Sequence, residues 1–135
     1  MKRLFLLGLV GICWAIVATA AGSQHTVAVT LNYDFSVDNA CSSSMTTGCV
    51  KQFNIYDITG GGTPVKLFSI AAPSGANSAV TGIAGTSGPV TLKSGVHTFA
   101  ATAQMADGTE SSPNGSTATA GVAPGSPASF SVVVQ

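Results

Sequence analysis

Charged residues are scarce in this chain of 135 residues, since Asp, Glu, Lys and Arg make up only 7% of it. The formal net charge is zero, and loss of Lys2 and Arg3 with an N-terminal leader changes it to 3 − 5 = −2. No basic cluster follows that leader. The composition therefore argues against nucleic acid and anionic membranes as partners.

Helical periodicity is also missing. Beyond residue 20, apolar residues alternate with polar ones over short segments that end at Gly, Pro, Asn or Asp, which is typical of strands and turns. The pattern predicts one all-β domain in a mature chain of 135 − 20 = 115 residues. The expected strands cover residues 27–35, 50–59, 65–70, 80–83, 90–92, 97–105 and 116–122.

Motifs for catalysis are absent as well. The two histidines, His25 and His97, stand in no nucleophile or metal motif, and His97 has the alternation of a packed strand residue. Asp34, Asp38 and Asp57 have no calcium-loop spacing and are expected to be solvated. The sequence predicts a protein that is not an enzyme and that holds no metal or cofactor.

The longest apolar run lies at the N-terminus. Two basic residues precede an apolar stretch from Leu4 to Val17, and Ala18-Thr19-Ala20 fits a cleavage site. The stretch is short for a membrane span, which leaves an uncleaved anchor as the less favoured alternative. Residues 1–20 are therefore interpreted as a cleaved signal peptide, which predicts a secreted protein at the cell surface without membrane insertion.

Two cysteines remain in the mature chain, Cys41 and Cys49, separated by small and polar residues. An even number of cysteines in an exported chain predicts a disulfide, and no nearby histidine completes a zinc site. We expect Cys41 and Cys49 to be bonded to each other.

Four segments resemble, in order and spacing, those of a fibronectin type III domain. Residues 29–34 are similar to its second strand, with Tyr33 where a Trp is usual, and residues 53–57 are similar to its third. Residues 92–99 resemble the corner before the sixth strand, and residues 107–111 resemble the turn before the last. A bacterial Ig-like domain is the alternative. The resemblance covers about residues 26–122 and implies an Ig-like antiparallel β-sandwich over residues 21–122, but by itself no function.

The first strand of such a sandwich is missing from this pattern. It pairs with the second strand, yet residues 21–25 are too short for a strand and its turn. The segment Val27–Phe35 should then form an edge strand without the Lys or Pro that usually protects an edge. The expected acceptor edge consists of Val27, Val29, Leu31, Tyr33 and Phe35.

A further strand pattern follows the domain. Residues 123–127 have the composition of a linker, and Phe130, Val132 and Val134 then alternate with polar or smaller residues over 128–135. This segment resembles the first strand of a following fibronectin-like domain. It is predicted to be a donor strand that adds to the acceptor edge of another copy, as in pilin complementation.

Two functional hypotheses follow from these features. In the first, the protein is a secreted structural subunit whose only partner is itself, assembled head-to-tail into an extracellular filament. In the second, it is a monomeric adhesion or carbohydrate- or protein-binding accessory domain. A structural alternative to donation places 128–135 as the domain's own last strand, with residues 116–122 as a loop.

Overall fold

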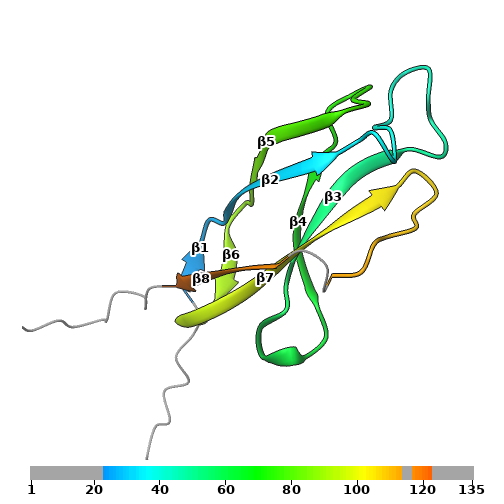
Figure 1. Ribbon diagram of the computed structural model, residues 1–135. Coiled ribbons are helices and arrows are strands. Elements are labelled where there is room, and N and C mark those ends of the chain that lie inside the picture. Colours follow the sequence, from blue (N-terminus) through cyan, green and yellow to red (C-terminus); the bar gives the residue numbers. More distant parts are fainter. Residues whose placement is uncertain (1–22, 114–116, 123–135) are drawn as a thin grey trace, which may run out of the picture.

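The computed structural model describes residues 23–113 and 117–122, and this part of the chain is all-β (Figure 1). It contains no α-helix within these ranges, and a single 3₁₀ turn, η1 (Thr59–Gly61), follows the third strand. The strands are β1 (Ser23–His25), β2 (Ala28–Asp34), β3 (Val50–Asp57), β4 (Val65–Ala71), β5 (Ala79–Thr86), β6 (Val90–Leu92), β7 (Gly95–Met105) and β8 (Thr117–Val122).

The strands form antiparallel sheets. One sheet has four strands in the order β4-β3-β7-β8, and two smaller sheets consist of β2 with β5 and β1 with β6. The strand β1 continues the path of β2, and β6 continues that of β5, so the smaller sheets form one long two-stranded ribbon (Figure 1). The arrangement is compatible with a β-sandwich.

The ribbon contains a bulge near its centre. The pairing of β2 with β5 shifts by one residue between Leu31 and Tyr33. Gly82 lies in the shifted segment with a φ of 74°, and its N–H donates to the side-chain oxygen of Asn32 over 2.9 Å. Because L-residues rarely adopt a positive φ, glycine is suited to this position.

The first strand differs from expectation. Residues 21–25 were expected to be too short for a strand, but Ser23–His25 pairs with β6. These residues extend the ribbon away from β2 and do not turn back beside it, so they leave the edge of β2 uncovered. This strand therefore does not pair with the open edge of β2.

The core lies between the ribbon and the four-stranded sheet. Apolar side chains from both layers are buried there: Phe35, Phe53, Ile55, Ile70 and Ile83. The rings of Tyr33, Phe35 and Phe53 pack together with centroids 4.8 to 6.1 Å apart. Aromatic packing of this kind adds to the stabilisation from apolar burial.

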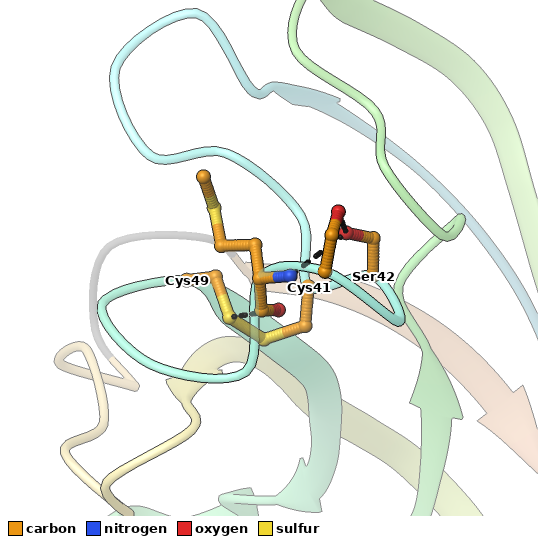
Figure 2. The surroundings of a disulfide bond; sticks show 5 residues. Cys41, Ser42 and Cys49 are labelled. Atoms are coloured by element: carbon orange, nitrogen blue, oxygen red, sulfur yellow. Dashed lines mark hydrogen bonds between the residues drawn. A yellow bond between two sulfur atoms is a disulfide. The ribbon is translucent and has the colours of Figure 1, made fainter.

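The predicted disulfide is present. Cys41 and Cys49 are bonded and close the loop between β2 and β3 (Figure 2). Inside this loop the Met45 N–H donates to the Ser42 hydroxyl oxygen over 3.1 Å, and the Met45 carbonyl oxygen lies 3.3 Å from the Cys49 sulfur. By the chain-entropy model a closure of this length stabilises the fold by about 2 to 3 kcal/mol.

The structure confirms one further expectation from the sequence and contradicts another. The hairpin across Gly60–Gly62 is confirmed by the pairing of β3 with β4. The alternative in which residues 116–122 form a loop is wrong, because Thr117–Val122 pairs with β7. The leader, the linker and the segment with Phe130, Val132 and Val134 lie outside the described residues. No helix in the described ranges is long and apolar enough to cross a membrane.

Candidate functional site: the open edge of β2 and the groove beside it

The strand β2 is paired on one side only. Its partner is β5, and within residues 23–113 and 117–122 no strand pairs with its other edge. The opposite layer ends in a second such edge, because β8 pairs with β7 alone. Unpaired N–H and C=O groups on an edge strand are a template for another strand.

The side chains of β2 alternate in burial along its whole length. Ala28, Thr30, Asn32 and Asp34 are exposed, whereas Val29, Leu31 and Tyr33 point inward. These inward side chains pack on the core and yet stay only half-buried. A sheet face that is fully covered would bury them, so the cover is incomplete on the side of the open edge.

A groove accounts for the partial burial. Its central cavity has a volume of about 290 Å³ and runs between residues 27–31 and residues 117–120 of β8. Ile55, Phe99 and Ala101 form its floor. The lining is therefore largely apolar, and both walls are edge strands.

Two further cavities extend the groove. The one toward the end of β2, about 250 Å³, is lined by Leu31, Tyr33 and Phe53 and shares Leu31 and Ala101 with the central cavity. The one toward β1, about 210 Å³, is lined by His25 and Leu92 and shares Val27 and Phe99 with it. The shared residues make one continuous groove along β2.

A buried nitrogen without a partner lies at the β1 end of this groove. The Nε2 atom of His25 is the one buried side-chain nitrogen or oxygen in the described ranges without a hydrogen-bond partner. His25 also lines the cavity of about 210 Å³. An unsatisfied buried polar atom is costly unless water or another polar group satisfies it.

Polar side chains cover the outer face of the four-stranded sheet. The Glu110 carboxylate accepts hydrogen bonds from the amide of Asn54 over 2.9 Å, from the hydroxyl of Tyr56 over 2.8 Å and from the hydroxyl of Thr102. Burial raises the pKa of Glu110, but these hydrogen bonds outweigh it and lower the pKa below its ordinary value. The cluster fastens the loop after β7 to the sheet, and Thr102 and Ser111 in this region also line the cavity of about 250 Å³.

A second polar cluster lies where β3 ends. The Nε2–H of His97 donates to the Lys93 carbonyl over 2.8 Å, and Nδ1 lies 2.7 Å from Asp57. The bond to Lys93 is the largest contribution that raises the pKa of His97, with Asp57 adding to it against the effect of burial. His97 is 8% exposed, which agrees with the packed, hydrogen-bonded histidine expected from the sequence.

No cluster of three or more His, Cys, Asp or Glu side chains that could hold a metal ion occurs in the part of the chain described here. The acids Asp34 and Asp57 instead accept hydrogen bonds from the neighbouring Ser36 and Thr59. The residues that line the central cavity of the groove are largely apolar.

No protein-family model, curated protein or solved structure matches this chain.

The structure places four of the five expected acceptor residues in the groove and the fifth in the core. Val27, Val29, Leu31 and Tyr33 line the groove, whereas Phe35 follows β2 and is completely buried in the core. The far wall, formed by Thr117–Ala120 of β8, was not expected from the sequence. Its alternation of Thr and Ala shows a strand, but no local pattern shows which strand it faces.

Proposed function

We propose that this protein is a secreted structural subunit with an Ig-like, fibronectin type III-like β-sandwich, and that it assembles head-to-tail into an extracellular filament. In this proposal residues 128–135 of one copy add to the open edge of β2 in the next copy. The protein then has a structural and not a catalytic role. The observation that carries the proposal is the apolar groove along the unpaired edge of β2.

The groove and the segment match in chemistry. The groove exposes half-buried apolar side chains at alternate positions of β2, and the segment carries Phe130, Val132 and Val134 at alternate positions. Alternate residues of a strand project from the same face about 6.6 to 6.8 Å apart, on both strands. A strand in the groove can therefore pair its backbone with β2 and bury its apolar face.

The free energy gained by apolar burial and the free energy lost on association are of comparable size. Burial of three such side chains contributes roughly 5 to 8 kcal/mol. Association costs about 4 to 15 kcal/mol. Ladder hydrogen bonds add about 0.5 to 1.5 kcal/mol each, so several of them bring the balance to a stable complex. A stable complex therefore requires both the apolar face and the backbone pairing.

The test compares the mature chain with a variant in which Phe130, Val132 and Val134 are all replaced by Ser. Light scattering should give large assemblies for the first and monomers for the second. The matched control replaces Ser129 and Ser131 by Ala on the other face of the segment, and it should still assemble.

A synthetic peptide of residues 126–135 provides the complementary measurement. It should bind the triple variant and raise its unfolding temperature, while a peptide of the same composition in scrambled order should not. A mature chain that remains monomeric at high concentration, together with a triple variant that ignores the peptide, would refute the proposal. Saturable binding of a glycan by that monomer would support the adhesion alternative.

A further inference from the structure

The direction of the added strand decides what kind of assembly can form. The end of β8 and the start of β1 lie at the same end of the molecule, because Val122 pairs with Gly95 and Ser23 pairs with Leu92 just before it (Figure 1). We call this end the near pole, and the end of β2 at Asp34 the far pole. Residues after Val122 therefore start from the near pole.

Two routes into a groove follow from this position. A segment that enters at the near pole runs parallel to β2. It can reach the groove of its own copy, or the groove of a second copy whose near pole faces the near pole of the first. Both arrangements close, as a monomer or as a two-fold dimer. A segment that enters at the far pole runs antiparallel to β2, and it requires a copy placed head-to-tail, an arrangement that repeats without closing.

Resting on the proposed function, we infer that the donor strand enters at the far pole and runs antiparallel to β2, with Phe130 opposite Leu31, Val132 opposite Val29 and Val134 opposite Val27. Each cavity of the groove then receives one inward side chain of the donor strand. Antiparallel pairing is also slightly more stable per residue than parallel pairing.

The aromatic lining of the far-pole cavity favours this direction. The far-pole cavity, about 250 Å³, contains the aromatic pair Tyr33 and Phe53, whose ring centroids are 5.1 Å apart. It would receive Phe130, the largest donor side chain, in a position to pack on both rings. The near-pole cavity is smaller, about 210 Å³, and would receive Val134. The parallel direction exchanges these two side chains.

Two pairs of cysteine substitutions in the full mature chain distinguish the directions. Thr26→Cys is combined with Gln135→Cys for the antiparallel register and with Ser129→Cys for the parallel register. Thr26 is exposed on the outward side of the ribbon. After mild oxidation, the pair with Gln135→Cys should give a ladder of covalent oligomers on a non-reducing gel, at least tenfold more abundant than with Ser129→Cys.

A mixture of the single variants Thr26→Cys and Gln135→Cys should give covalent dimers of one copy of each, which confirms exchange between copies. A second variant exchanges side chains at constant composition, Phe130→Val with Val134→Phe. It should assemble at least tenfold more weakly than the unchanged chain, because Phe then meets the smaller cavity.

The inference is overturned if the pair with Ser129→Cys is the one that cross-links, as a monomer or as a closed dimer. It is also overturned if assemblies form and neither pair cross-links, or if the exchange variant assembles as well as the unchanged chain. The proposed function fails separately, when the unchanged mature chain remains monomeric in light scattering and the peptide of residues 126–135 does not bind the triple Ser variant.

Discussion

The Nδ1 atom of His97 lies 2.7 Å from a carboxylate oxygen of Asp57, and Nε2 of the same ring bonds the Lys93 carbonyl. Since carbonyl and carboxylate oxygens only accept, this environment favours the ring with a proton on both nitrogens. The pair ties the start of β7 to the end of β3 at one end of the four-stranded sheet. A contact between a charged histidine and a carboxylate makes stability depend on pH.

The stabilisation from this pair should be greatest at mildly acidic pH. The pKa of His97 is raised from its ordinary 6.5, so its contribution is complete below 6.5 and is lost as pH rises through the higher folded value. Burial raises the pKa of Asp57, but bonds from Thr59 and His97 outweigh it and lower the pKa from 3.8. Its contribution is complete above 3.8 and is lost as pH falls through the folded value.

Urea unfolding of the mature chain and of His97→Gln at pH 5.5 and pH 9 measures this effect. We expect the variant to lose about 1 to 2 kcal/mol of unfolding free energy at pH 5.5, and clearly less at pH 9. An equal loss at both values would show that the charge of His97 plays no part.

Removal of the Glu110 carboxylate should destabilise the fold. Glu110→Ala leaves the buried amide of Asn54 without its acceptor, and we expect a loss of about 2 kcal/mol in unfolding free energy. Glu110→Gln retains an acceptor oxygen and should lose about half as much. Chemical unfolding gives both values, and a loss under about 0.5 kcal/mol for the Ala variant would contradict the role of this cluster.

The packing of the two layers requires a glycine at position 85. A Cβ atom there would lie 2.5 Å from Cγ1 of Ile70, which is buried in β4. We therefore expect Gly85→Ala to cost about 1 to 3 kcal/mol of unfolding free energy. Gly88→Ala, where an added Cβ meets nothing within 4 Å, is the matched control. Thermal unfolding compares them, and equal stabilities would disprove the close contact.

A larger side chain in the floor of the groove should separate monomer stability from assembly. Ala101 is half-buried and lines both the central and the far-pole cavities. Ala101→Leu should stabilise the monomer by about 1 kcal/mol, because it fills apolar space, and it should weaken the assembly. The control Ala84→Leu, on an exposed position of β5, should leave assembly unchanged.

Light scattering measures the assembly of these two variants, and unfolding of the triple Ser variant with and without Ala101→Leu measures the monomer. Full assembly of the Ala101→Leu chain would show that the groove is not where the copies meet.

Local sequence patterns were sufficient to predict the all-β class. Alternation along Val27–Phe35, the glycines between β3 and β4 and the two mature cysteines predicted a strand, a hairpin and a disulfide that the structure contains. Each of these features depends on residues that are near one another in the chain. Turn chemistry and side-chain alternation act over such distances, so they can be recognised without a fold.

Contacts between residues that are far apart in the chain could not be predicted from local patterns. The alternation of β2 indicates an inward face, but only the placement of β8 opposite it, about 90 residues later in the chain, turns that face into a groove. The bonds of Glu110 to Asn54 and Tyr56 likewise join residues more than 50 positions apart. The sequence thus determined most of the strand segments and which side chains alternate in them. Tertiary structure decided which edges stay open, because edge pairing depends on where the whole chain places each strand.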